Sequence, residues 1–352
     1  MIFLILILAL NFSCFENKST EKETNKPELA VTSKTDSLKF TSGIRAIFQD
    51  SKGNYWFGSH NEGVSVYNGV LFEYFTTNEG LSDNQIRSIE EDDNGKVWIG
   101  TAKGASLYDK GTFTNYPAKN NKPGYEWNKT NGDLWFYAGE EEGMNRFDGK
   151  NMNYLIFPKP KNEKPDNSYG VTGISKDNDG KVWIATYSAL FSYDGKMVNI
   201  FDHKALNLKD NEPLHIRSVL ADSKGRIWIG NNGIGVLLKK GDSIIHFSKE
   251  QGKLIPMNAF EANTKSQQFA KNTGLQSVFA IEEDSEGNIW FGDRDSGAWK
   301  YDGKILTNYK IDSKLNAQMI WSIYESPNKN LLFGMAGGGV YKFNGKTFDK
   351  QF

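Results

Sequence analysis

Residues 86–100 read IRSIEEDDNGKVWIG, and residues 216–230 read IRSVLADSKGRIWIG. Both stretches join an apolar run, a polar turn with aspartate and glycine, and a second apolar run around tryptophan. Related stretches recur along the chain, and their equivalent positions are Trp56, Trp98, Trp135, Trp183, Trp228, Trp290 and Leu332. The spacings of 42, 37, 48, 45, 62 and 42 residues are typical of propeller or solenoid repeats.

Each repeat predicts four short antiparallel strands. An apolar first strand, such as IRAIFQ over 44–49, is followed by a turn such as 50–53, in which aspartate accepts backbone N–H bonds and glycine takes the positive φ. The tryptophan strand comes next, and Asn-Gly or Asp-Gly pairs predict a hairpin between strands three and four. Seven such units fill residues 43–352, so we predict an all-β, seven-bladed β-propeller with four antiparallel strands per blade.

The third residue of each recognisable first strand is small, as expected where blades crowd around an axis. These residues are Ala46, Ser88, Gly173, Ser218, Ala280 and Ser322. The third unit lacks the turn aspartate, and the seventh has Leu332 in place of tryptophan, so both blades are expected to be shorter or distorted. The seventh unit supplies all four of its own strands, which predicts closure without strand exchange unless residues 37–40 add an outer strand.

The N-terminal region predicts export. Residues 2–10, IFLILILAL, are too short to span a bilayer and fit the apolar part of a secretory signal. The single cysteine, Cys14, follows directly, so we predict a lipoprotein-type signal peptide over 1–14 with lipidation on Cys14, and a flexible polar tether over 15–42. The predicted location is the periplasm, the outer membrane or the cell surface of a Gram-negative bacterium, with the lipid as the only membrane contact. An ordinary signal peptide with an incidental cysteine is the alternative.

Charge and histidine spacing exclude several classes of function. The 42 Lys and Arg residues nearly balance the 43 Asp and Glu residues, so no basic footprint for nucleic acid is expected. The four histidines show no metal-ligand spacing, and we predict neither a metal nor another cofactor.

The candidate ligand site lies where first strands begin, on the face that carries the long loops. The longest connection, 248–276, is expected to contain a short helix near 258–271. Three of the six arginines, Arg45, Arg87 and Arg217, occupy the second position of a first strand. Later blades have the aromatic residues Phe279 and Trp321 at the same position. Guanidinium groups recognise carboxylates and sulfates, and aromatic rings stack on sugars, so we predict a pocket for an acidic or sugar-like ligand. In the alternative, these arginines tie loops together between blades.

Further candidates are residues that break the repeat or precede an arginine strand: His60, Trp127, Tyr187, His215, Asp293 and Arg294. If the arginines prove to be structural, the acidic loops 140–142 and 293–295 are the next place to look for a site.

The stretch GLSDNQIRSIEEDDNGKVWIGTAKGASLYD (80–109) resembles the two-component-regulator propeller repeat of exported bacterial sensor regions. The resemblance implies the propeller fold and a role in recognition outside the cytoplasm. We therefore expect a non-catalytic, exported propeller that binds a small molecule, a glycan or an envelope protein. The alternatives are a propeller lyase or hydrolase, using histidine and acidic residues on the loop-rich face, and a scaffold for protein assembly.

Overall fold

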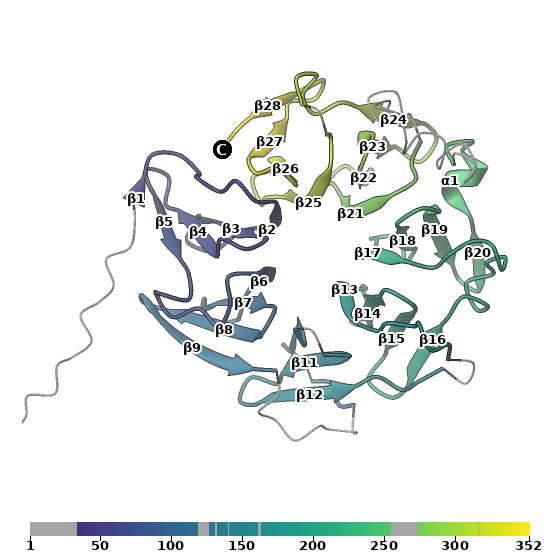
Figure 1. Ribbon diagram of the computed structural model, residues 1–352, viewed down its shortest axis with the longest axis horizontal. Coiled ribbons are helices and arrows are strands. Elements are labelled where there is room, and N and C mark those ends of the chain that lie inside the picture. The colour runs from purple at the N-terminus through teal and green to yellow at the C-terminus, as the bar shows by residue number, and fades with distance from the viewer. Residues whose placement is uncertain are drawn as a thin grey trace, which may run out of the picture. The chain divides into compact units, whose positions relative to one another are not determined.

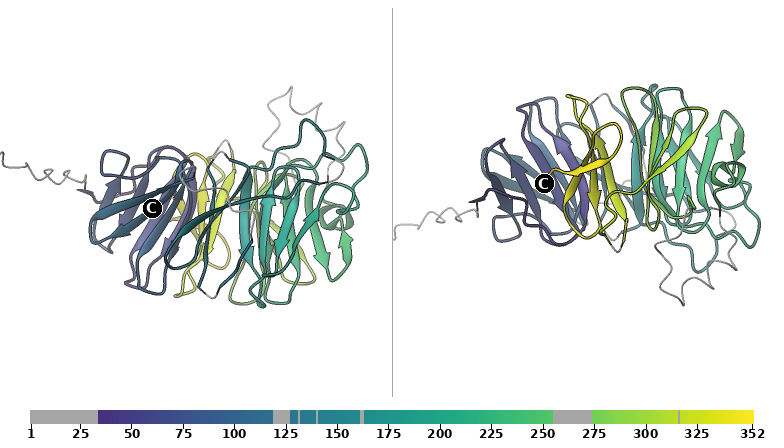
Figure 2. Two further views of the ribbon diagram at one scale, coloured as in Figure 1. Left: turned by 90° about the horizontal axis from the view of Figure 1, so that it is seen from below. Right: turned by 90° about the horizontal axis from the view of Figure 1, so that it is seen from above.

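The computed structural model describes residues 34–118, 127–130, 132–139, 141–160, 163–254, 274–315 and 317–352. Seven antiparallel sheets stand in a ring around a central axis (Figure 1). Their strands run between the two faces of the ring (Figure 2). The seven-bladed propeller predicted from the repeat is therefore confirmed.

The first three blades differ in strand number. Blade one has five strands: β1 (Lys34–Thr35), β2 (Ile44–Gln49), β3 (Tyr55–Ser59), β4 (Val64–Tyr67) and β5 (Phe72–Phe75). Blade two has four: β6 (Ile86–Glu91), β7 (Val97–Thr101), β8 (Gly104–Asp109) and β9 (Thr112–Pro117). Blade three has three among the described residues: β10 (Leu134–Tyr137), β11 (Gly143–Phe147) and β12 (Met152–Ile156). Its β10 is the tryptophan strand, so the described residues lack the innermost strand here.

The remaining four blades have four strands each. Blade four consists of β13 (Val171–Lys176), β14 (Val182–Thr186), β15 (Leu190–Tyr193) and β16 (Val198–Phe201). Blade five consists of β17 (Ile216–Ala221), β18 (Ile227–Asn231), β19 (Gly235–Lys240) and β20 (Ser243–Ile245), and is followed by α1 (Phe247–Glu250). Blade six consists of β21 (Val278–Glu283), β22 (Ile289–Asp293), β23 (Gly297–Tyr301) and β24 (Leu306–Tyr309). Blade seven consists of β25 (Ile320–Glu325), β26 (Leu331–Met335), β27 (Val340–Phe343) and β28 (Phe348–Lys350). The helix expected near 258–271 lies outside the described residues.

The hydrophobic core is divided among the interfaces between blades. The cluster between blades one and two, for example, joins Trp56 and Val64 to Ile86 and Ile99. Every repeat tryptophan is at most 5% exposed. The tryptophans therefore fill the space between sheets, as a residue repeated in every blade is expected to do, and do not form an open binding surface.

The small third residue of each first strand faces another small residue on the tryptophan strand. Ala46 pairs with Gly58, and a Cβ added to Gly58 would lie 2.4 Å from Ile86 of the next blade. A Cβ on Gly334 would lie 2.8 Å from the carbonyl oxygen of Ile44. Small side chains are required here because the first strand of the following blade packs directly against the pair, which confirms the predicted crowding.

Among the described residues, side chains close the ring without strand exchange. Blade seven comes from one continuous stretch, β25 to β28, as predicted. The Phe352 ring lies 5.0 Å from that of Phe57 in blade one. The Ser322 hydroxyl donates a 2.8 Å hydrogen bond to the carbonyl of Ile44. The seam therefore depends on apolar packing and a few hydrogen bonds.

Strand β1 pairs antiparallel with β5 on the outer edge of blade one. Residues 37–40, which the sequence offers as an outer strand, form no strand. Phe40 is nevertheless buried and packs against Tyr74 at a ring distance of 5.5 Å. The backbone N–H of Lys39 also donates to the Tyr74 hydroxyl at 2.8 Å. The tether predicted over 15–42 thus extends too far, because residues 34–42 belong to the propeller.

The predicted signal peptide with Cys14, and residues 15–33 of the predicted tether, lie outside the described residues. Within the described residues, no helix is long and apolar enough to cross a membrane.

Candidate functional site

A β-bulge at the start of the first strands creates the site. In blade one, Ile44 pairs with Ser59 and Ala46 pairs with Gly58, which leaves Arg45 as the extra residue. The same shift occurs in blades two, four, five, six and seven. A bulged residue leaves the regular alternation of the sheet, so its side chain can be directed elsewhere. The bulged residues of these six blades are Arg45, Arg87, Thr172, Arg217, Phe279 and Trp321.

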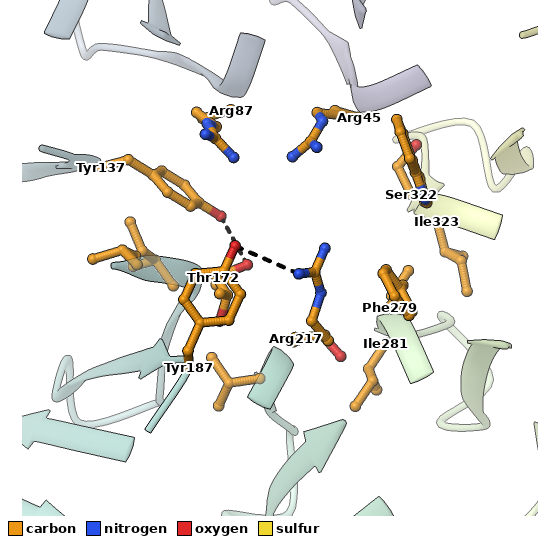
Figure 3. A pocket seen from close by; sticks show the side chains of 17 residues that line it. Arg45, Arg87, Tyr137, Thr172, Tyr187, Arg217, Phe279, Ile281, Ser322 and Ile323 are labelled. Carbon is orange, nitrogen blue, oxygen red and sulfur yellow. Dashed lines mark hydrogen bonds between the residues drawn. The ribbon is translucent and has the colours of Figure 1, made fainter. Parts of the chain in front are cut away.

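These six side chains, with Tyr137 and Tyr187, line one cavity at the axis of the ring. The cavity has a volume of about 220 Å³. The guanidinium groups of Arg45, Arg87 and Arg217 point toward a common space (Figure 3). No aspartate or glutamate is among the described residues that line it. The structure therefore brings the three arginines together, as the sequence predicted.

On one side of the cavity, Arg45 is held by His60 and Trp321. Its Nε donates to Nδ1 of His60 at 2.9 Å, and its guanidinium lies 4.7 Å from the centre of the Trp321 ring. The His60 ring meets Trp321 edge-on at 5.1 Å. His60 thus positions an arginine of the cavity without being a lining residue itself.

On the opposite side, Arg217 lies between two aromatic rings. Its guanidinium is 4.4 Å from the centre of Phe279 and 5.5 Å from that of Tyr187. The Tyr187 hydroxyl is 3.5 Å from the same guanidinium, at the limit of a hydrogen bond. His215 packs against Tyr187 at 5.0 Å. His215 therefore supports a lining residue from outside the cavity.

The electrostatics of the cavity are those of crowded positive charge. Burial, together with the charges of Arg87 and Arg217, lowers the pKa of the Arg45 guanidinium to about 10. Burial also lowers the pKa of Arg217. Burial and the charge of Arg45 lower the pKa of His60, which fits the neutral ring that its hydrogen bond with Arg45 requires. The Arg45 guanidinium, with its pKa of about 10, remains charged at neutral pH.

Several buried polar atoms around the cavity have no partner among the described residues. They are Nε of Arg87, Nε1 of Trp321 and Oγ1 of Thr172. Buried polar groups in proteins are nearly always hydrogen-bonded, and a missing partner costs roughly 1–3 kcal/mol. Unpartnered polar atoms also occur elsewhere among the described residues, for example at Asn145, Asn231 and His246, so these three are not a feature of the cavity alone.

Two further predicted site residues, both in blade six, are not among the residues that line this cavity. Asp293 is buried, and its carboxylate accepts backbone N–H bonds from Gln276 and Ser277. Arg294 donates to Asp295 at 2.8 Å and belongs to an ion pair. Both residues therefore organise the loops of blade six.

The remaining repeat-breaking candidate, Trp127, packs on Trp135 and Tyr193 in the core of blade three. In the acidic loop proposed as a second choice, Glu142 binds Lys159 at 2.7 Å. Residue 140 of that loop lies outside the described residues. These groups therefore take part in local structure, away from the axial cavity.

Sequence reasoning missed two lining residues, Tyr137 and Thr172. The tyrosine occupies the position two residues after the Trp-type residue, where the other blades have Gly58, Gly100, Ala185, Gly230, Gly292 and Gly334. The Tyr137 hydroxyl donates to the Thr172 carbonyl at 3.3 Å, and the ring lines the axial cavity. The one large residue at a position otherwise held by glycine or alanine was the available signal.

A second cavity, of about 350 Å³, lies where the described part of blade three lacks an inner strand. Tyr137 lines both cavities, and Glu90 and Lys176 line only this one. Burial raises the pKa of Glu90 to about 7. Glu90 therefore lies outside the described lining of the arginine cavity, which keeps its uniform positive charge.

No group of three or more His, Cys, Asp or Glu side chains in the described part of the chain is arranged to hold a metal ion.

These observations define a β-propeller with a basic cavity at its axis. The family described as "Two component regulator propeller" matches residues 39–61, 80–103, 165–188, 212–233 and 274–295. Five segments of the chain are thus similar to the two-component regulator propeller repeat. The matched segments fall in blades one, two, four, five and six, and the two unmatched blades are those that lack the turn aspartate. No curated protein matches the sequence.

Solved structures with a similar fold come from proteins of different kinds. One is the extracellular domain of a protein described as a hybrid two-component system from B. thetaiotaomicron, with 19% identity and a TM-score of 0.63, covering 88% of this chain and 40% of that one. Virginiamycin B lyase from Staphylococcus aureus has 16% identity and a TM-score of 0.63, covering 88% and 98%. PorZ, a surface component of the type-IX secretion system of Porphyromonas gingivalis, has 14% identity and a TM-score of 0.58, covering 87% and 48%. These identities show the fold alone, and this chain spans 40% of the B. thetaiotaomicron domain.

Proposed function

We propose that this chain is a non-catalytic, exported recognition module of the sensor type, which binds its ligand in the axial cavity. The observation that carries the proposal is the set of bulged residues. One bulged side chain from each of six blades lines the same cavity. These residues differ from blade to blade, whereas the residues at the packing positions repeat. A concave site lined by a few convergent polar groups is where proteins usually bind small molecules.

The alternatives receive less support from the described residues. A hydrolase or lyase of the predicted kind would use histidine together with an acidic residue, and the described lining of the cavity contains no carboxylate. A pure scaffold gives no reason for three arginines to converge on one cavity with no carboxylate in its described lining.

A substitution that fills the cavity tests where the ligand binds. Thr172→Trp should preserve the fold, because blade seven already carries Trp321 at the equivalent bulge. A ligand at 100 times its Kd stabilises a protein by roughly 2.7 kcal/mol, so a ligand from an extract of the native envelope should raise the melting temperature of the wild type. The same ligand should have no effect on Thr172→Trp. Equal stabilisation of both proteins would place the ligand elsewhere and contradict the proposal.

We propose further that the protein is a lipoprotein attached through Cys14 to the outer membrane or another envelope surface of a Gram-negative bacterium. The apolar run 2–10 followed by a single cysteine supports this, as does the extracellular setting of a similar propeller. A labelled fatty acid should be incorporated into the wild type, and Cys14→Ala should abolish the label. Equal labelling of the two proteins would refute the anchor.

A further inference from the structure

We infer that the axial cavity binds a small polyanion, or the charged end of a longer chain, through the guanidinium groups of Arg45, Arg87 and Arg217. This inference rests on the proposed function and specifies the ligand of the same site. The shared chemistry is a group of two or three carboxylates or other oxyanions held close together.

The pairing of the six arginines is the first support. Arg146, Arg226 and Arg294 each form an ion pair with an aspartate. The three arginines of the cavity have no carboxylate partner among the described residues, and none lines the cavity with them. Buried or half-buried positive charge is costly unless it is paired. An anionic ligand would supply the negative charge that an aspartate supplies to each of the other three arginines.

The aromatic residues give the second support. Phe279 and Trp321 lie 4.4 Å and 4.7 Å from the guanidinium groups of Arg217 and Arg45. These faces are therefore engaged in cation–π contacts, which hold the guanidinium planes in place. Trp321 also packs against the backbone of Gly43, since a Cβ there would lie 2.1 Å from the ring. The rings thus position arginines for an anion, and the sequence-based expectation that they stack on a sugar is replaced by this role.

The crowding of like charge gives the third support. The three guanidinium groups point toward one space (Figure 3), and the charges of Arg87 and Arg217 help to lower the pKa of Arg45. Anionic oxygens are the strongest hydrogen-bond acceptors for guanidinium donors. The three guanidinium groups repel one another, and a bound anion would reduce that repulsion. The site is therefore arranged for negative charge before the ligand binds.

Size limits the ligand. The cavity of about 220 Å³ is smaller than the roughly 300–1,000 Å³ of sites that enclose drug-sized molecules. It fits a compact polycarboxylate, or one terminal acidic residue of an oligosaccharide whose other residues remain outside.

Calorimetric titration with three probes tests the inference: citrate, a galacturonate trimer and the neutral galactose trimer. Citrate or the galacturonate trimer should bind the wild type, with an affinity that falls as salt is added. Arg87→Gln and Arg217→Gln should each weaken binding about tenfold or more. Lys304→Gln removes the same charge from an exposed turn and should leave the affinity unchanged. Binding of citrate alone would identify a free polycarboxylate, and binding of the galacturonate trimer alone would identify the acidic end of a glycan.

Two results would overturn the inference. One is that neither charged probe binds at millimolar concentration. The other is that the galactose trimer binds as tightly as the charged trimer and is unaffected by the arginine substitutions. If that neutral binding is lost in Thr172→Trp, the proposed function stands and only the anionic ligand is wrong. If a charged probe binds Thr172→Trp as it binds the wild type, the axial site itself is wrong.

Discussion

At the scale of single residues, the turn aspartate and the repeat tryptophan form one unit. In blades one, two, four, five and six the aspartate accepts the indole N–H at 2.7–3.0 Å, and it also accepts backbone N–H groups of its own turn. In blade seven, Ser326 and Leu332 replace both members. Losing the two together is physically consistent, because no indole donor remains for an aspartate to accept from, and the Ser326 hydroxyl accepts the Asn330 N–H of its own turn at 3.2 Å.

Blade three keeps the tryptophan without the aspartate, and this provides a matched test. Nε1 of Trp135 is buried with no partner in the described residues, whereas that of Trp290 donates to Asp284 at 2.7 Å. Trp290→Phe and Trp135→Phe remove the same atoms from equally buried sites. We expect Trp290→Phe to lower the free energy of unfolding by about 1–2 kcal/mol more than Trp135→Phe, since only it breaks a hydrogen bond. Urea unfolding measures the difference, and equal losses would show that the hydrogen bond contributes nothing net.

At the scale of strands, the bulge links the repeat to the site. Sequence periodicity predicted the strands, the turns and the small third residue because these depend on local chemistry and on a packing problem that every blade shares. It also indicated Arg45, Arg87 and Arg217, since rare residues at one repeat position stand out. The bulge itself has no clear sequence signature, so the direction of the side chains became visible only in three dimensions.

Breaking the repeat does not decide what a side chain contacts. Asp293 and Arg294 break the repeat, yet they serve loop structure through backbone N–H groups and Asp295. Tyr137 was missed because it reaches the cavity beside Thr172 of the next blade, a contact that the repeat does not encode. A break in a repeat therefore indicates a residue freed from the shared packing, and its surroundings decide whether it binds a ligand or supports a loop.

At the scale of the whole ring, the absence of strand exchange makes the seam between blades seven and one a distinct element of stability. A continuous hydrogen-bonded sheet across the seam would have to break before the ring opens. Here the connection consists of the cluster around Phe57, Phe72 and Phe352, the Ser322–Ile44 hydrogen bond, and a bond from the Gln49 N–H to the Tyr324 hydroxyl. The seam is therefore where we expect the ring to open first.

Phe352→Ala tests this expectation. The ring of Phe352 lies within 6 Å of the rings of Tyr55, Phe57, Tyr67 and Phe72. Because Phe352 is only partly buried, its loss should cost about 2–3 kcal/mol, below the usual 3–5 kcal/mol for a phenylalanine in a core. Hydrogen exchange should quicken mainly in β2 and β25, with β13 and β17 on the far side little affected. Ile305→Ala, at a side chain that is 64% exposed, is the control and should change neither stability nor exchange. Equal acceleration in all seven blades would mean that the ring opens as one cooperative unit, and that its closure does not depend on the seam.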